Sequence, residues 1–464
     1  MLRSVSVVGL GKLGVGLAAV MAEGGLLTIG VDIEERIVRA INRGSAPVVE
    51  PGLQELISKH GGKTLVATTD HTRALAETDV TFILVATPSD DDGAFMTTYL
   101  ESALGGLASA LRTSTKAHHT FVISSTVMPE TTDQILIPLI ARCSGRRPGQ
   151  GFSVCYDPEF VALGEVIKGF QKPEMIVIGE DHPGAGDMVE AIHRKVCKST
   201  PNIFRMSIVS AELAKVSLNT YLTVKISFGN MLANLAERIS KAQIDLITEA
   251  IGQDPRISPY FLRGGPAYGG PCFPRDTKAF LALAERYGYD AKIVEAVEQT
   301  NELQNAHLLG LVLKALQRCP GPVGILGLSF KPKTPVLTAS PAMKLAEELL
   351  KRGVKVVVYD PLALEDARSS LADRVYYACS AKDCVDLASV CVVANRDAEY
   401  KLAVEEYRGN EPKFVIDCWR MLDSARLCTS IRYFAWGRAS SHINPNGQPA
   451  LEETAQSDIR AAVD

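Results

Sequence analysis

The 464-residue chain lacks an excess of basic residues, long hydrophobic runs and the cysteine spacings of metal sites. Its 49 Lys and Arg residues against 53 Asp and Glu residues give a net charge of −4, which argues against a nucleic-acid partner. No uncharged apolar window reaches about 18 residues, so we expect no membrane span. The ten cysteines form no Cys-x-x-Cys pair and no zinc-like spacing, so we expect no metal.

The composition is that of a large globular enzyme. Hydrophobic residues make up 46% of the chain and charged residues 22%, which are ordinary values for globular proteins. At about 150 residues per domain, the length predicts roughly three domains. Several cysteines, such as Cys391, lie inside apolar runs and are expected to be small buried side chains. These features favour a cytoplasmic enzyme, because thiols stay reduced in that compartment.

Two segments of the chain alternate strand and helix patterns. In the first, apolar β-branched runs at 4–8, 27–31, 64–68, 80–86 and 120–124 are separated by helical patterns. In the second, similar runs occur at 323–328, 354–359, 389–394 and 414–417. Strands separated by helices indicate βαβ units and a parallel sheet. The sequence therefore predicts an α/β protein with two Rossmann-like domains.

A helical region separates these two segments. Residues 206–242 contain no proline and a single glycine, and they read as one long helix with a polar stripe along an otherwise apolar surface. Such a helix suits a connector between domains. We expect an N-terminal cofactor domain at 1–202, a central helical domain at 203–313, a C-terminal α/β domain at 314–440 and a flexible polar tail at 441–464.

A glycine motif follows the first predicted strand. Gly9, Gly11 and Gly14 form Gly-x-Gly-x-x-Gly between a strand and a helix, and Asp32 ends the next strand. This context is typical of a dinucleotide site, where the glycines admit a pyrophosphate and the carboxylate binds the ribose hydroxyls. A carboxylate there repels a 2′-phosphate, which favours NAD over NADP. The alternative is a tight turn in an unrelated α/β sheet.

Polar residues end several later strands. Thr87 follows the strand at 80–86, and Thr126 belongs to Ser-Ser-Thr-Val at 124–127. Ligands of open parallel sheets bind at the carboxyl ends of strands. Glu159, in Asp-Pro-Glu-Phe, is a further candidate. Each of these residues is ambiguous when taken alone.

The sharpest local feature is the loop Gly-Gly-Pro-Ala-Tyr-Gly-Gly-Pro-Cys-Phe-Pro-Arg-Asp at 264–276. Cys272 is flanked by glycine and proline, and Arg275 and Asp276 follow it closely. A cationic neighbour favours the thiolate, which is the nucleophilic form of cysteine. A catalytic and a structural role for Cys272 are about equally supported by the loop alone.

Taken together, these motifs resemble the UDP-glucose/GDP-mannose dehydrogenase family. The resemblance covers about residues 1–430 and rests on GLGKLG at 9–14, VVEPGL at 48–53, ATP at 86–88, SSTV at 124–127, DPEF at 157–160, AELAKVSLNTYLTVKISFGN at 211–230, GGPCFPRD at 269–276 and ILGLSFKPKT at 325–334. It implies an NAD-dependent enzyme that oxidises C6 of a UDP- or GDP-sugar to a carboxylate in two hydride transfers. It also implies a homodimer or a higher homo-oligomer.

The resemblance implies roles for individual residues. Cys272 resembles the nucleophile that captures the aldehyde as a thiohemiacetal and then carries a thioester. Water positioning, oxyanion stabilisation and base catalysis are implied for Thr126, Lys215, Asn219, Asp276 and Glu159. Cofactor contacts are implied for Gly9, Gly11, Gly14, Asp32, Thr87, Thr126 and Arg275, and substrate contacts for Glu159, Lys215, Asn219, Arg256, Tyr268, Gly269 and Lys331. Arg256 resembles an arginine that reaches the sugar across a dimer interface.

The chain also departs from the family pattern. Arg275 stands where a lysine is usual, and Pro271 replaces a small serine. The usual acidic stretch and Arg-Glu after Thr334 are absent, and Asp-Cys-Trp-Arg at 417–420 replaces Asp-Gly-Arg. These changes affect substrate or cofactor contacts and leave the sugar open. Two other interpretations remain: a two-electron hydroxyacid or polyol-type dehydrogenase, and a non-catalytic NAD-binding relative.

Overall fold

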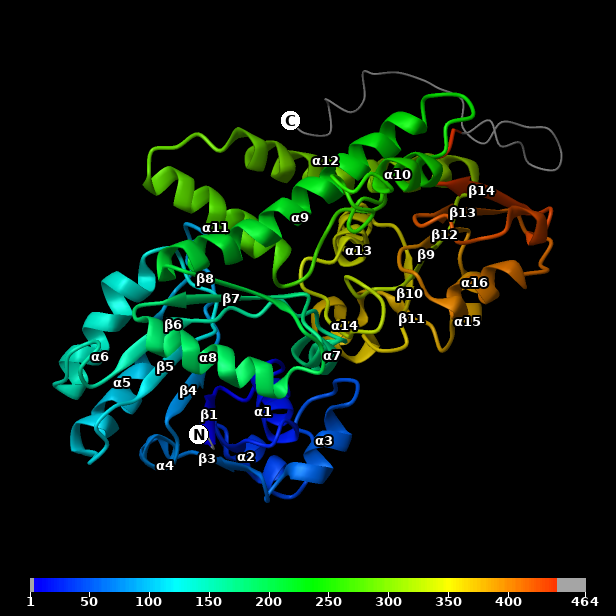
Figure 1. Ribbon diagram of the computed structural model, residues 1–464. Helices are drawn as coiled ribbons and strands as arrows, with labels where there is room; N and C mark the ends of the chain where they lie inside the picture. Colours follow the sequence, from blue (N-terminus) through cyan, green and yellow to red (C-terminus); the bar gives the residue numbers. More distant parts are fainter. Residues whose placement is uncertain (1–3, 440–464) are drawn as a thin grey trace. The chain divides into compact units, whose positions relative to one another are not determined.

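The computed structural model describes residues 4–439, and the chain divides into two units. The first unit holds residues up to 218 together with 278–289, and the second holds residues 219–277 and those from 290 onward. Helices α9 (Ile208–Ala236) and α11 (Phe273–Arg286) each run from one unit into the other (Figure 1). No helix within the described residues is both long and apolar enough to cross a membrane.

The first unit is built on an eight-stranded sheet of order β3-β2-β1-β4-β5-β6-β7-β8. All neighbouring strands are parallel except β6 and β7, which run antiparallel. Its strands are β1 (Ser4–Val8), β2 (Leu27–Val31), β3 (Leu65–Thr68), β4 (Val80–Ile83), β5 (Thr120–Ile123), β6 (Ser153–Tyr156), β7 (Met175–Glu180) and β8 (Asn202–Met206). The central strands read as continuous apolar runs because helices bury both of their faces.

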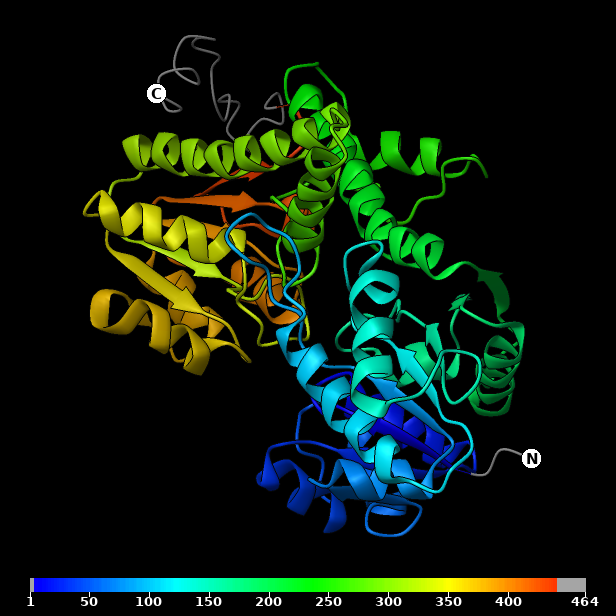
Figure 2. The same cartoon turned by 90° about the vertical axis from the view of Figure 1, so that its left-hand side faces the viewer.

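Two apolar clusters lie against the first sheet. One is shared by α1 (Gly14–Glu23), α2 (Glu35–Asn42), α3 (Leu53–His60), α7 (Val166–Gln171) and α8 (Pro183–Val196). The other is shared by α4 (His71–Glu77), α5 (Thr98–Thr113) and α6 (Ile137–Ser144). Helices α5 and α6 lie side by side in Figures 1 and 2. The layers are those of a doubly wound α/β fold.

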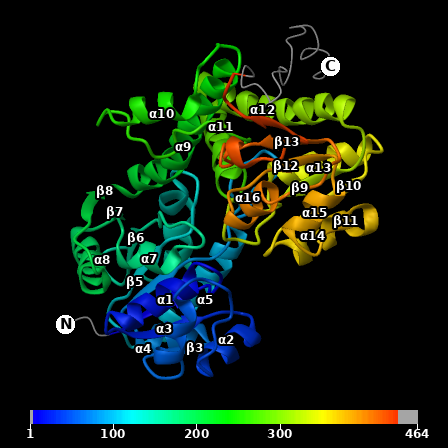
Figure 3. The ribbon, with the colours of Figure 1, turned by 90° about the vertical axis from the view of Figure 1, so that its right-hand side faces the viewer.

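The second unit contains a six-stranded parallel sheet of order β11-β10-β9-β12-β13-β14. Its strands are β9 (Val323–Leu326), β10 (Val356–Tyr359), β11 (Tyr376–Tyr377), β12 (Val390–Val393), β13 (Lys413–Asp417) and β14 (Ile431–Ala435). One core cluster is shared by α10 (Ile244–Gly252), α12 (Lys292–Arg318), α13 (Pro341–Lys351) and α14 (Leu364–Leu371). The other lies under α15 (Ala381–Leu387) and α16 (Ala398–Glu405), so helices cover both faces of this sheet too (Figure 3).

The two sheets repeat one strand–turn connection. Gly9 has φ +89° and donates its N–H to Val31 O at 2.8 Å. Gly327, at the same place in the second sheet, has φ +93° and donates to Tyr359 O at 2.8 Å. Only glycine adopts such a φ without strain. The prediction of an α/β protein with two Rossmann-like sheets is therefore confirmed.

The element boundaries differ from the sequence prediction in two places. The expected domain boundary after residue 202 falls inside β8, which pairs with β7 and extends the first sheet to Met206. Helix α9 ends at Ala236, six residues earlier than expected, and the chain turns before α10. Neither difference follows from local pattern. Strand β8 contains polar residues and is identified by its pairing with β7. The turn after α9 is held by a distant residue, since Gly437 N–H donates to Glu237 at 3.0 Å. The tail predicted at 441–464 lies outside the described residues.

A buried carboxylate holds a strained turn in the first unit. Glu130 has φ +73°, a left-handed conformation that is costly for a non-glycine residue. Its N–H donates to Glu212 at 2.7 Å, and Thr132 N–H donates to the other carboxylate oxygen at 2.9 Å. Glu212 itself is fully buried, and burial raises the pKa of its carboxyl to about 7.

Replacing Glu212→Ala is expected to lower the free energy of unfolding by about 2 to 4 kcal/mol, because two buried N–H groups lose their acceptor. The folded protein holds the Glu212 proton more tightly than the unfolded chain does. The contribution of Glu212 to the free energy of unfolding is therefore complete below the ordinary pKa of 4.5 and declines as the pH rises through 7. In denaturant unfolding, the wild type should therefore exceed Glu212→Ala in free energy of unfolding by more at pH 5 than at pH 8.

The matched control is Glu77→Ala, which removes an exposed ion pair with Arg73 and should change the unfolding free energy by less than about 0.5 kcal/mol. A Glu212→Ala protein as stable as the wild type would contradict this role of Glu212. A difference in free energy of unfolding that grows between pH 5 and pH 8 would also contradict it.

Candidate active site

The glycine motif forms a tight connection between β1 and α1. A Cβ built on Gly14 would lie 1.8 Å from Gly9 O, so the fold itself requires this glycine. Gly11 differs, since its own Cβ position meets nothing within 4 Å and the residue is exposed. The absence of a side chain at Gly11 therefore leaves room for a ligand at the helix N-terminus, where backbone N–H groups and the helix dipole favour a phosphate.

Asp32 lies at the end of β2, beside this connection. One of its carboxylate oxygens accepts from Leu10 N–H at 2.7 Å, and the other accepts from Glu34 N–H at 2.9 Å. A carboxylate offers about four lone-pair sites, so Asp32 keeps capacity for two ribose hydroxyls. The residues present therefore fit a bound dinucleotide.

The second sheet carries an aspartate at the equivalent position but does not offer the same site. Asp360 is 2% exposed and accepts from the N–H groups of Leu328, Ser329, Leu362 and Ala363 and from the Ser329 hydroxyl. These five donors use its acceptor capacity. The repeat of architecture therefore does not extend to a second dinucleotide site of the same kind.

Two predicted residues meet at the ends of β4 and β5. The Thr87 hydroxyl donates to Thr126 O at 2.7 Å, and both residues are buried. Ser125, which the sequence did not single out by itself, accepts from Val85 N–H at 2.9 Å and donates to Val85 O at 2.7 Å. These bonds fix the carboxyl ends of neighbouring parallel strands, the edge at which ligands of such sheets bind.

Glu159 and Lys215, distant in sequence, form a buried pair in the first unit. The Lys215 ammonium lies 3.3 Å from Glu159 Oε1 and also donates to the Glu159 carbonyl. The side chain of Lys215 is 5% exposed and that of Glu159 is 14% exposed. The centre of the Phe160 ring lies 5.0 Å from the ammonium. Val161 N–H donates to Glu159 Oε2 at 2.8 Å. A pair so enclosed can hold or move a proton in a site with little water.

A histidine that sequence reasoning missed supports this pair. His193, on α8, lies 2.8 Å from the carboxylate of Asp157, which is two residues before Glu159. Burial opposes a charge on the imidazole, but the Asp157 carboxylate outweighs it and raises the pKa of His193 to about 10. The Asp157 carboxylate therefore favours the charged form of His193. No local signal in the sequence links it to Asp157.

In the second unit, four predicted residues meet at the start of α11. Asp276 is fully buried and accepts from Asn219 Nδ2 at 2.6 Å. Its other oxygen accepts from Arg275 Nε at 2.9 Å, so the guanidinium predicted to bind the cofactor lies on Asp276. Cys272 is exposed and forms no disulfide, and its carbonyl accepts from Asp276 N–H at 2.8 Å. The positive end of α11 therefore lies at the thiol.

Helix α9 carries residues of both groups. Lys215 and Asn219 lie one turn apart on it, and Asn230 follows farther along the predicted polar stripe. Asn230 accepts from Gly265 N–H at 2.9 Å and donates to Pro266 O at 3.4 Å. The polar stripe of the long helix therefore serves the backbone of the cysteine-bearing loop.

Other side chains hold the rest of that loop. Asn301 accepts from Tyr268 N–H at 2.8 Å and donates to Tyr268 O at 3.2 Å, and Gln304 donates to Gly265 O at 2.6 Å. Gly269 packs so closely on the 334–340 segment that an added Cβ would lie 2.3 Å from Ala339 O. The departure from the family pattern at 335–339 thus lies directly against the loop.

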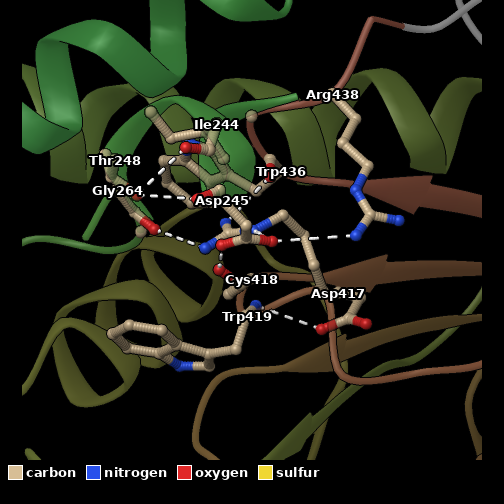
Figure 4. A network of polar contacts seen from close by, with 12 residues as sticks. Ile244, Asp245, Thr248, Gly264, Asp417, Cys418, Trp419, Trp436 and Arg438 are labelled. Carbon is tan, nitrogen blue, oxygen red and sulfur yellow. Dashed lines mark hydrogen bonds and ion pairs between the residues drawn. The ribbon is translucent and has the colours of Figure 1, made fainter. Parts of the chain in front are cut away.

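The Asp-Cys-Trp-Arg departure also has a structural role. The Arg420 side chain is 2% exposed and donates to Gly264 O at 2.9 Å, to Trp436 O at 2.9 Å and to the carboxylate of Asp245 at 2.8 Å. Figure 4 shows this network, which joins α10, the loop and β14 within the second unit. The donors of Arg420 are therefore used within the protein, and the buried side chain cannot bind a ligand.

The other predicted substrate residues of the second unit have contacts of their own. Arg256 is exposed and forms an ion pair with Asp254 at 2.6 Å. Tyr268 is 7% exposed, and its hydroxyl donates to Glu298 at 2.8 Å. Lys331 lies with its ammonium 5.6 Å from the centre of the Phe330 ring. Within residues 4–439, no group of three or more His, Cys, Asp or Glu side chains is placed to bind a metal ion.

Comparison with known proteins identifies the family. Three domain models match the chain in order: the NAD binding domain of the UDP-glucose/GDP-mannose dehydrogenase family over residues 3–197, its central domain over 209–303 and its UDP binding domain over 324–424. The chain belongs to the UDP-glucose/GDP-mannose dehydrogenase family. It is thus an NAD-dependent nucleotide-sugar dehydrogenase, as the resemblance implied.

Relatives of the dehydrogenase cover nearly its whole length. UDP-glucose 6-dehydrogenase AglM of Haloferax volcanii is 35% identical over 420 residues, 90% of this chain and 97% of the relative. GDP-mannose 6-dehydrogenase of Pseudomonas putida is 32% identical over 422 residues, 88% and 94% of the two chains. The solved UDP-glucose dehydrogenase of Pyrobaculum islandicum has a TM-score of 0.85 at 32% identity, covering 95% of this chain and 98% of that one.

The two glycines of the cofactor connection of this dehydrogenase should respond differently to alanine. Gly11→Ala places a methyl group where the phosphates approach, so the Kd for NAD should rise about tenfold with little change in Tm. Gly14→Ala places a Cβ against Gly9 O and should lower the free energy of unfolding by about 2 kcal/mol or more. NAD titration and thermal unfolding separate the two effects, and unchanged NAD affinity in Gly11→Ala would contradict this role.

Proposed function

We propose that this enzyme oxidises the C6 alcohol of a UDP- or GDP-hexose to the carboxylate, with Cys272 as the covalent nucleophile. The observation that carries the proposal is the placement of Cys272, exposed at the start of α11 on a loop whose backbone is fixed by buried side chains. Gly9, Gly11, Gly14 and Asp32 would hold NAD at the connection of β1 and α1, where it would supply the hydride acceptor for each of two oxidations at C6.

The residues of the chain divide the remaining work. The Cys272 thiol adds to the aldehyde carbon, so the intermediate cannot escape between the oxidations. The amide of Asn219, oriented by Asp276, donates a hydrogen bond to the oxygen that becomes negative when the thiohemiacetal forms. Lys215, one turn away on α9, supplies a second donor with a positive charge. Loss of the second hydride leaves a thioester on Cys272.

Hydrolysis of the thioester needs a base and a positioned water. Glu159 is held by Val161 N–H and by Lys215, and its carboxylate can take a proton from water. Thr126, fixed at the end of β5 by Thr87, is the second group that we assign to the water. His193 acts through Asp157 to hold the segment that carries Glu159.

The comparisons support a class of substrate, and the two units divide its contacts from those of the cofactor. The match to a UDP binding domain and the relatives acting on UDP-glucose and GDP-mannose support a nucleoside diphosphate hexose. We propose the NAD contacts at Gly9, Gly11, Gly14 and Asp32 in the first unit and the sugar-nucleotide contacts at Arg256, Gly269 and Lys331 in the second. Arg256 is 87% exposed, which suits a residue that serves a partner subunit.

Assembly and compartment complete the proposal. The second-unit part of α9 exposes Tyr221, Phe228, Met231 and Leu235 on one face, each at 45% or more. Such a row of large apolar side chains suits burial against a second copy, so we propose a homodimer or a multiple of it. The ten cysteines, none of them in a disulfide, suit the reducing cytoplasm.

The proposed chemistry has a fixed stoichiometry. Two NADH should form for each sugar nucleotide consumed, because the thiol retains the aldehyde until the second oxidation. A panel of UDP- and GDP-sugars with NAD, followed by absorbance of NADH and by analysis of the acid product, measures this ratio. One NADH per substrate would support a two-electron dehydrogenase instead. No NADH with any sugar nucleotide would support a non-catalytic relative.

Replacing the nucleophile should uncouple the two oxidations. Cys272→Ser is expected to lower the rate of acid formation by about a hundredfold or more, since a serine hydroxyl is a far weaker nucleophile at neutral pH. Quenched-flow analysis should show turnover stalled at the aldehyde or at a covalent species. Cys379→Ser, which replaces another exposed cysteine of the second unit, is the matched control. Full steady-state acid formation by Cys272→Ser would remove the thiol from the mechanism.

A further inference from the structure

An arginine held on an indole lies at the carboxyl edge of the second sheet. Arg396 follows β12, and its guanidinium carbon lies 4.9 Å from the centre of the Trp419 ring. Trp419 follows β13, and its indole N–H donates to Ala394 O at 2.9 Å. Because this bond fixes the ring, the stacked guanidinium is also held in one orientation.

Trp419 in turn contacts the cysteine-bearing loop. A Cβ built on Gly265 would lie 2.9 Å from Cζ3 of the indole, so the ring packs directly on this glycine. The Trp419 N–H donates to Asp417 at 3.0 Å, which fixes the turn that carries the ring. Arg396 is therefore connected through one aromatic ring to the loop that ends at Cys272.

The end of β12 is also tied to the end of β9. Asn395 Nδ2 donates to both the carbonyl and the hydroxyl of Ser329 at 3.2 Å. Lys331, to which the resemblance assigns a substrate contact, follows Ser329 by two residues. The two strand ends thus present a lysine and an arginine at the same edge of the sheet.

The arginines at this edge lack anionic partners. Arg396 and Arg263 are both exposed, and no carboxylate among the described side chains lies within 4.0 Å of either guanidinium. Arg263 is two residues from Gly265, on which the indole packs. Although Arg396 keeps an accessible surface, partial desolvation of its guanidinium, together with the charges of Arg263 and Arg420, lowers its pKa. Gathered positive charges of this kind are stabilised when an anion binds among them.

We propose that Arg396, seated on Trp419, binds the diphosphate of the nucleotide sugar. This inference rests on the proposed function, which makes a nucleoside diphosphate hexose the substrate. The diphosphate carries the substrate's negative charge, and the planar guanidinium donates to two phosphate oxygens at once. Arg420 cannot take this role, because its donors are used by Gly264, Trp436 and Asp245.

The test measures binding without turnover. Calorimetric titration with UDP, GDP and inorganic pyrophosphate should give Kd values at least about tenfold higher for Arg396→Ala than for the wild type. Arg396→Lys keeps the charge but loses the planar donors, so it should fall between the two. In kinetic assays with the preferred sugar nucleotide, Arg396→Ala should raise KM and leave kcat within about twofold.

Two controls separate binding from folding. Arg368→Ala removes an arginine stacked 4.1 Å over the Tyr377 ring, near β11 at the edge of the sheet, and should bind all three probes like the wild type. The NAD affinity of Arg396→Ala reports on the first unit and should be unchanged.

Unchanged Kd values in Arg396→Ala, or a wild type that binds none of the three probes, would overturn the proposal. Weaker binding of UDP and GDP with unchanged binding of pyrophosphate would also overturn it, by assigning Arg396 to the nucleoside. A different result would contradict the proposed oxidation and not the role of Arg396. In that case the wild type would bind UDP or GDP but form no NADH with any sugar nucleotide.

Discussion

The arrangement of the second unit depends on the need of buried backbone polar groups for partners. The loop 264–270 is irregular, so its N–H and C=O groups cannot pair within a helix or a sheet. Side chains take their place: Asn230 of α9, Asn301 and Gln304 of α12, and Arg420 after β13. These four residues hold the loop in one conformation and thereby place the thiol that follows it.

This constraint also explains what the departures from the family pattern do in the structure. The altered turn at 417–420 contributes one buried arginine to the loop and one indole that carries Arg396. The altered segment after Thr334 packs on Gly269 and accepts from Gly270 N–H at 2.9 Å. Both changes act on the support of the loop and on the surface beside it. The hydrogen bond between Asn219 and Asp276 and the ion pair between Lys215 and Glu159 lie outside the altered segments.

The sequence predicted what depends on local pattern. The predicted bounds of β1 and β2 match the structure to the residue, because each strand is rich in β-branched residues and ends at the glycine motif or at Asp32. Strands β6, β8, β11 and β14 are not predicted, since they are short, mixed in polarity or at sheet edges. Strand β7 is not predicted either, although its centre is an apolar run inside the sheet. The Asp157–His193 pair and the burial of Arg420 depend on contacts 36 and 156 residues apart in sequence, which no local pattern reveals.

In the proposed reaction, the substrate becomes bound to Cys272 as a thioester between oxidation and hydrolysis. Mass spectrometry of the enzyme, acid-quenched during steady-state turnover and digested, tests this claim directly, because thioesters survive in acid. We expect the peptide containing Cys272 to carry the mass of the sugar nucleotide at the acid oxidation level. Acid product formed while that peptide stays unmodified, or an adduct on a different cysteine, would contradict it.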